Sequence, residues 1–164
     1  MDRPPTLIIG FGNPDRQDDG IAWHILSRLA AYFKIERSDE DADDFLPGGS
    51  NPDLLFALQL TPEMAETIAQ YERVCFIDAH TGDIQEELRV QEINAAFQNS
   101  PLTHHMTPQT LLSLVETLYR KKPGAILISI RGYEFGFMRS LSNNSAGILP
   151  TAVQRIIEWF QADK

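Results

Sequence analysis

The sequence contains one cysteine, Cys75, and this scarcity excludes two kinds of site. A disulfide framework within the chain is impossible, and a cluster of thiolates cannot hold a metal ion. Basic residues are also few, since 14 Lys and Arg face 23 Asp and Glu and leave a net charge of −9. A chain of this charge repels phosphate groups, so nucleic acid and anionic membranes are excluded as natural partners.

Long apolar runs are absent as well. No uncharged stretch approaches the length that crosses a bilayer, and the first ten residues lack the apolar core of a signal peptide. We therefore expect a soluble, cytoplasmic protein. The sequence does not decide the oligomeric state, for which a monomer is the simplest expectation.

The 164 residues, 43% of them hydrophobic, fit a single domain spanning residues 1–164. Six of the nine residues from Glu36 to Asp44 are acidic, and a Pro-Gly-Gly-Ser stretch follows at 47–50. This composition is typical of a solvated loop. We expect a mobile acidic loop at about residues 36–52.

Short apolar runs alternate with segments of helical periodicity along the rest of the chain. The runs predict strands at 6–11, 53–59, 74–78, 87–93 and 125–130. Helices are predicted at 18–34, at 61–71 with Thr61 as N-cap, from 107 to the stretch 121–124, and from 149–151 to about 161. This order predicts a three-layer αβα, doubly wound fold. Its twisted, mainly parallel sheet has helices on both faces, and 87–93 is an antiparallel or edge strand.

Ligands of open α/β sheets bind beyond the carboxyl ends of the strands, so polar residues that follow a strand are the first candidates. The loop GFGNPDRQDDG follows the first predicted strand. Gly10 and Gly12 permit a tight turn, Asn13 can tie the loop down, and Gly20 closes it.

Two carboxylates, Asp18 and Asp19, stand at the end of this loop. They are candidate metal ligands, or they serve only the N-terminus of the following helix. A dinucleotide fingerprint is the tempting alternative, but Asp15 stands where it needs a third glycine. A bound phosphate would also meet three carboxylates, so the phosphate-dependent small-molecule enzyme is a weak reading.

Asp78 ends the buried run VCFID, where an isolated carboxylate would be costly without a partner or a cation. The alternative is that Asp78 caps the next turn, in which His80 and Asp83 belong to a surface loop. The adjacent His104 and His105 precede the helix at 107, and the sequence does not say which of them points inward.

Two carboxylates and one imidazole from separate loops form a nitrogen and oxygen ligand set. Such a set suits Ni, Zn, Mn or Fe(II) and leaves coordination positions open. His24 lies inside the first predicted helix, where a structural role is expected.

The segments IIGFGNPDRQDDGIAWHI, RVCFIDAH and LTHHMTPQTLL, in this order, resemble the hydrogenase maturation proteases. ISIRGYEFGF and ILPTAVQRIIEW resemble the closing segments of that family, so the resemblance covers nearly the whole chain. One departure is Ala22, which stands where family members usually carry glycine in D-D-G-x-G.

The resemblance implies a twisted, mainly parallel sheet and an endopeptidase that removes the C-terminal extension of a nickel-loaded hydrogenase large-subunit precursor. It implies that Asp19, Asp78 and His105 are the metal-contacting and catalytic residues, with Asp18 and His104 in reserve. Nickel would be carried by the substrate, with no organic cofactor. The alternative is an assembly chaperone that checks the metal without cutting.

Overall fold

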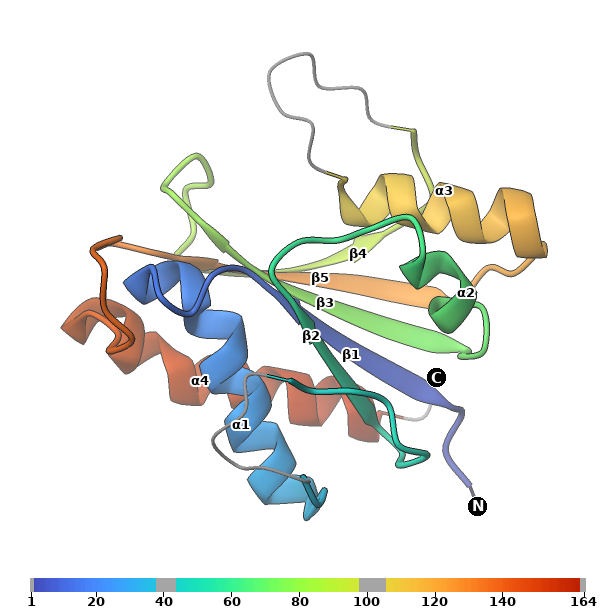
Figure 1. Ribbon diagram of the computed structural model, residues 1–164, viewed down its shortest axis with the longest axis horizontal. Coiled ribbons are helices and arrows are strands. Elements are labelled where there is room, and N and C mark those ends of the chain that lie inside the picture. The colour runs from blue at the N-terminus through green and yellow to red at the C-terminus, as the bar shows by residue number, and fades with distance from the viewer. Residues whose placement is uncertain (1, 38–43, 98–105, 163–164) are drawn as a thin grey trace.

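A computed structural model describes residues 2–37, 44–97 and 106–162 of the chain (Figure 1). Within these residues five strands form one sheet in the order β2-β1-β3-β5-β4. Their bounds are β1 Thr6–Phe11, β2 Asp53–Ala57, β3 Arg73–His80, β4 Leu88–Ile93 and β5 Gly124–Arg131. β1, β2, β3 and β5 pair in parallel, whereas β4 pairs antiparallel with β5 at the edge. The predicted sheet, including its antiparallel edge strand, is confirmed.

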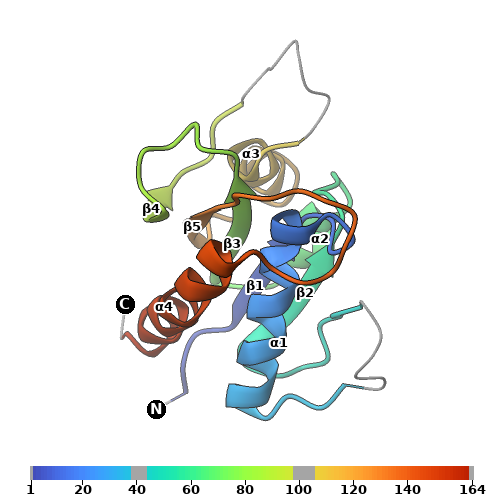
Figure 2. The same ribbon diagram turned by 90° about the vertical axis from the view of Figure 1, so that its left-hand side faces the viewer.

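Helices cover both faces of the sheet (Figures 1 and 2). α1 (Ile21–Phe33) and α4 (Asn143–Gln161) pack on one face, and α2 (Met64–Ile68) and α3 (Pro108–Tyr119) pack on the other. β1 shows why both layers are needed, because Ile8 faces the first pair of helices while Leu7 and Ile9 face the second. All three side chains are fully buried. Burying each one contributes about 1.5–3 kcal/mol.

Three helix boundaries differ from the predictions. A separate 3-10 turn, η1 (Gln17–Gly20), precedes α1, so the first α-helix begins at Ile21 and not at Asp18. α2 is only five residues long and has Glu63, not Thr61, as its N-cap. α4 begins at Asn143, six residues before Leu149, because the Ser142 side chain accepts the N–H of Ser145 and caps the helix there.

Residues 44–52, the segment that leads into β2, are held to the rest of the fold. Phe45 is 3% exposed, and its carbonyl accepts the N–H of Phe56. The N–H groups of Gly48 and Ser50 donate to Oδ1 of Asp53. Residues 44–52 are therefore more than a solvated loop, whereas residues 38–43 of the predicted acidic loop lie outside the described residues.

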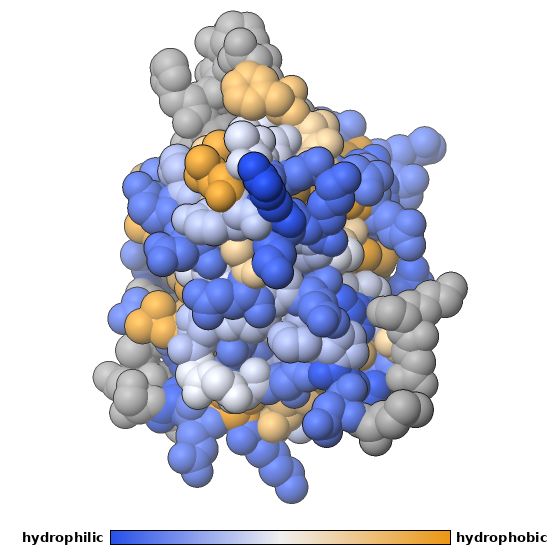
Figure 3. Space-filling model, turned by 90° about the vertical axis from the view of Figure 1, so that its right-hand side faces the viewer, coloured by the Kyte–Doolittle hydropathy of each residue, from blue (hydrophilic) through white to orange (hydrophobic). Residues whose placement is uncertain are grey.

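The face at the amino ends of the strands is largely hydrophilic, with scattered apolar side chains (Figure 3). None of the helices in the described ranges is long and apolar enough to cross a membrane.

Cys75 lies within β3 and is fully buried, and its burial raises the pKa of the thiol.

Candidate functional site

The two predicted aspartates come together where the strand order reverses. β1 has β2 on one side and β3 on the other, so the connections after β1 and β3 diverge at this point. Asp19 lies in η1, shortly after β1, and Asp78 lies near the end of β3. Both face a cavity of about 380 Å³. This is the switch-point position at which open α/β sheets bind ligands.

The turn after β1 holds the Asp19 carboxylate in place. Its Oδ2 accepts the N–H of Asn13 at 2.8 Å, while the Asn13 side chain accepts the N–H of Asp15 at 2.9 Å. Gly12 has a φ of +140°, and a Cβ on it would lie 2.1 Å from the carbonyl oxygen of Asp19. Only glycine fits there, because a side chain would push the Asp19 backbone away.

Two further glycines allow the turn to sit close to the sheet and to α1. A Cβ on Gly20 would lie 2.4 Å from Cα of Pro14. A Cβ on Gly10 would lie 3.0 Å from Cβ of Ala22, which is fully buried. Because Gly10 has no side chain, the Ala22 methyl group can pack directly against the backbone of β1.

Asp78 is partly buried, and its pKa is raised to about 7. Burial is the largest cause, followed by the negative charge of Asp19, while the N–H of Ala79 opposes both. Asp83 adds a smaller repulsion. A carboxyl group with this pKa exchanges its proton near neutral pH, as a general acid or base must.

The cavity has apolar walls around its two acids. Phe11, Leu58, Leu60 and Met106 line it, and Leu58 is 67% exposed at its rim. Apolar walls with a few polar groups are typical of sites that bind organic ligands. The arrangement can place the apolar part of an organic ligand against the walls while the two carboxyl groups face a polar group.

The predicted histidines, His104 and His105, lie outside the described residues. The described chain resumes at Met106, and both Met106 and Thr107 line the cavity. Thr107 is the N-cap of α3, because its hydroxyl accepts the N–H of Thr110. Among the residues in the described ranges, no three His, Cys, Asp or Glu side chains form a metal-binding group.

Asp18, the reserve ligand, is committed elsewhere. Its Oδ2 accepts the N–H groups of Tyr133 and Glu134 and the hydroxyl of Ser142, and its Oδ1 accepts the N–H of Ser142. Burial alone would raise the pKa of Asp18, but these hydrogen bonds outweigh it and lower the pKa. Neither Asp18 nor Asp19 caps α1 with its side chain, so the helix-capping alternative is wrong for both.

The other candidate side chains have structural contacts. His80 is 7% exposed, with Nε2 at 3.0 Å from the carbonyl of Glu86 and Nδ1 accepting the N–H of Gly82. It shapes the β3–β4 connection from the interior, rather than lying on the surface as predicted. His24 contacts the carbonyl of Arg139 through Nε2 at 3.0 Å, in line with the expected structural role.

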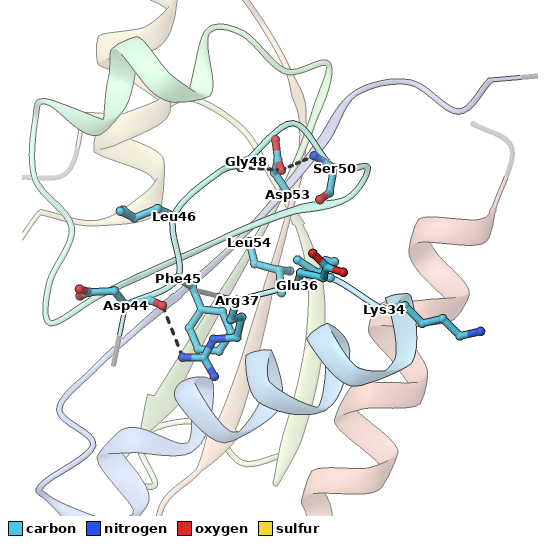
Figure 4. A pocket seen from close by; sticks show the side chains of 11 residues that line it. Lys34, Glu36, Arg37, Asp44, Phe45, Leu46, Gly48, Ser50, Asp53 and Leu54 are labelled. Carbon is cyan, nitrogen blue, oxygen red and sulfur yellow. Dashed lines mark hydrogen bonds between the residues drawn. The ribbon is translucent and has the colours of Figure 1, made fainter. Parts of the chain in front are cut away.

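A larger cavity of about 550 Å³ lies between the end of α1 and the start of β2 (Figure 4). Two of its polar side chains bond within it: Asp53 accepts two backbone N–H groups, and Arg37 stacks on Phe45 while its Nη2 donates to the carbonyl of Asp44. It lies away from the carboxyl ends of β1 and β3. We therefore take the cavity at Asp19 and Asp78 as the candidate functional site.

Sequence reasoning missed the segment between β5 and α4, which crosses over to η1 (Figure 2). Its residues contact Asp18 across 115 or more positions of the chain. No local pattern in the sequence carries that information. It also missed the apolar walls of the cavity, since Leu58 and Phe11 resemble ordinary strand residues.

No family model and no curated protein sequence match the chain. Among solved structures, the hydrogenase maturation protease HycI from Thermococcus kodakarensis KOD1 superposes with a TM-score of 0.65 at 16% identity, covering 99% of this chain and 96% of that one. HybD from the same organism gives 0.63 at 18% identity, with 96% and 99% covered. HybD from E. coli gives 0.63 at 13% identity, with 96% and 92% covered.

The resemblance to hydrogenase maturation proteases thus extends from sequence motifs to the fold of nearly the whole chain. The arrangement of the sheet and the helices around it matches the fold of these proteins. At these identities the likeness establishes the fold.

Replacing Asp18 by Asn tests the buried hydrogen bonds. A lowered pKa means that the charged form stabilises the fold above the ordinary value of 3.8 and that this contribution is lost as the pH falls through the lowered pKa. We expect Asp18→Asn to lower the free energy of unfolding by about 2–3 kcal/mol near neutrality and by less in acid. Denaturant unfolding across pH measures this. Asp15→Asn, at an exposed ion pair with Arg139, is the control and should change it by less than about 0.5 kcal/mol.

Replacing Asp78 by Asn tests the raised pKa. The charged carboxylate is disfavoured in the fold, so its cost is absent below the ordinary pKa of 3.8 and complete above about 7. We expect Asp78→Asn to raise the free energy of unfolding by about 1–3 kcal/mol above that pH and to change it little in acid. Thermal unfolding at two pH values distinguishes this from a pH-independent effect, which would contradict the assignment.

Replacing Gly12 by Ala tests the close approach of the turn to Asp19. The added Cβ displaces the Asp19 backbone, so the variant should lose stability by about 1–3 kcal/mol. Gly124→Ala is the matched control, because its Cβ would meet no atom nearer than 4.0 Å. Equal thermal stability of the two variants would contradict the geometry.

Proposed function

We propose that this protein is an endopeptidase of hydrogenase maturation. It removes the C-terminal extension of a hydrogenase large-subunit precursor that already carries nickel. The nickel belongs to the substrate, and Asp19, Asp78 and His105 contact it. Similar solved structures are named as hydrogenase maturation proteases, which supports this class of reaction.

One observation carries the proposal. Asp19 and Asp78 come from different strand ends and line the same cavity at the switch in strand order, on a fold shared with these proteases. The Asp19 charge raises the pKa of Asp78, so the two groups repel each other when both are ionised. A divalent cation brought by the substrate relieves that repulsion, because it attracts both carboxylates.

The third contact is assigned from the position of His105 in the sequence. His105 directly precedes Met106, which lines the cavity beside the two acids. An imidazole adds the nitrogen ligand that nickel accepts readily alongside oxygen. Three contacts from the protease bind a metal weakly by themselves, so productive binding depends on a precursor that already holds its nickel.

Hydrolysis of the peptide bond requires a water molecule to lose a proton while its oxygen attacks the carbonyl carbon. One of the two cavity carboxylates, Asp19 or Asp78, takes this proton and passes it to the departing amine. The described cavity wall contains neither serine nor cysteine, the Thr107 hydroxyl is bonded to Thr110, and the Cys75 thiol is fully buried. These features favour direct attack by water over a covalent intermediate.

The decisive experiment incubates the purified protein with a nickel-loaded precursor and follows the shortened product by gel mobility and mass spectrometry. Asp19→Ala, Asp78→Ala and His105→Ala should each reduce processing by at least about 100-fold, because each removes a contact to the reacting centre. Glu92→Ala, an exposed acid on β4, is the control and should process normally.

The outcomes separate this proposal from its alternative. Tight binding of the loaded precursor without a shortened product would favour a metal-checking chaperone. Processing of metal-free precursor at the same rate would contradict recognition of nickel. Unchanged cleavage by His105→Ala, with loss in His104→Ala, would transfer the third contact to His104.

A further inference from the structure

The segment between β5 and α4 presents two large apolar side chains to solvent. Phe137 is 86% exposed and Met138 is 50% exposed, and the fraction for Phe137 exceeds that of every other large apolar side chain in the described ranges. An exposed phenylalanine by itself is unremarkable in a mobile loop. The backbone that carries this one, however, is fixed on both sides.

Three consecutive contacts hold the tip against the turn after β1. The Nε–H of Arg16 donates to the carbonyl of Phe135 at 3.1 Å, and the N–H of Gly136 donates to the Gln17 side chain at 3.1 Å. The N–H of Gln17 donates to the carbonyl of Met138 at 2.8 Å. The Phe137 side chain is thus exposed to solvent on a backbone segment that these hydrogen bonds hold in one conformation.

The tip also carries a positive charge within an acidic protein. The Arg16 guanidinium lies 4.5 Å from the centroid of the Phe137 ring. The nearby Asp15 carboxylate is paired with Arg139 at 2.8 Å. The ring and the guanidinium form one unit, and a protein that buries this ring in an apolar recess meets a cation at the rim.

The position of this unit links it to the candidate site. Arg16 and Gln17 belong to the same turn as Asp19, and three peptide units span at most about 11 Å from Arg16 to Asp19. Figure 2 shows the segment crossing over to this turn. A macromolecule bound at Asp19 is therefore within reach of Phe137.

We infer that Phe137, Met138 and Arg16 form a docking element for the folded body of the precursor whose C-terminal segment enters the Asp19–Asp78 cavity. This inference rests on the proposed function. The occupant is a protein surface with an apolar recess for the Phe137 ring and a carboxylate at its rim that pairs with Arg16. Pre-ordered aromatic and arginine side chains are favourable anchors, because little conformational entropy remains to be lost on binding.

The test measures the rate of processing as a function of precursor concentration for the full-length protein. Phe137→Ala should raise KM by at least about tenfold and leave kcat within about twofold, because the docking element lies outside the reacting centre. Phe137→Leu, which keeps an apolar side chain, should restore most of the lost affinity. Leu118→Ala removes another exposed apolar side chain, 62% exposed on α3, and should match the wild type.

A second measurement follows binding alone, without peptide cleavage. In the Asp78→Asn background, which should not cleave, binding of the nickel-loaded precursor is measured with and without Phe137→Ala, and the second change should weaken it by the same factor. Arg16→Gln should weaken binding and reduce its dependence on salt.

The outcomes separate the two proposals. If the wild type cleaves the precursor and Phe137→Ala has an unchanged KM, the docking element is wrong and the proposed function stands. An equal rise in KM for Leu118→Ala would also overturn the docking element, because loss of any exposed apolar side chain would then have the same effect. If the wild type neither binds nor cleaves the precursor, both proposals fall.

Discussion

The buried carboxylate of Asp18 holds the carboxyl edge of the sheet in one arrangement. Four donors from the segment between β5 and α4 converge on it, and they belong to only three residues. Leaving such a group without its donors costs several kcal/mol, so the segment and the turn after β1 must be placed together. Asp19 is the next residue, and its position follows from that constraint.

Local patterns in the sequence predicted the parts of the fold that local physics decides. The apolar runs at 6–11 and 125–130 became buried strands, and the alternating run at 87–93 became the antiparallel edge. The predictions failed where distant contacts or caps decide. Ser142 caps the last helix, so that helix begins at Asn143, earlier in the chain than predicted. A 3-10 turn replaces the predicted first turn of α1, because Asp18 and Asp19 bond to groups outside the helix.

The candidate site was predictable in part for the same reason. Parallel strands end at one edge, so acids that follow β1 and β3 were expected to lie near each other, and both line one cavity. The sequence could not distinguish the roles of adjacent acids. Asp18 points to the segment after β5 and Asp19 points to the cavity, a division set by contacts that lie more than a hundred residues away.

The burial of Cys75 removes the one thiol of the chain from contact with other molecules. A thiol enclosed on all sides, with a pKa far above neutrality, does not ionise and offers no sulfur to a passing cation. Thiolate is the donor that would compete most strongly for soft transition metals. Under the proposed function, a client that carries a metal would meet oxygen and nitrogen donors here but no thiolate, and oxidants find no sulfhydryl on the exterior of the protein to attack.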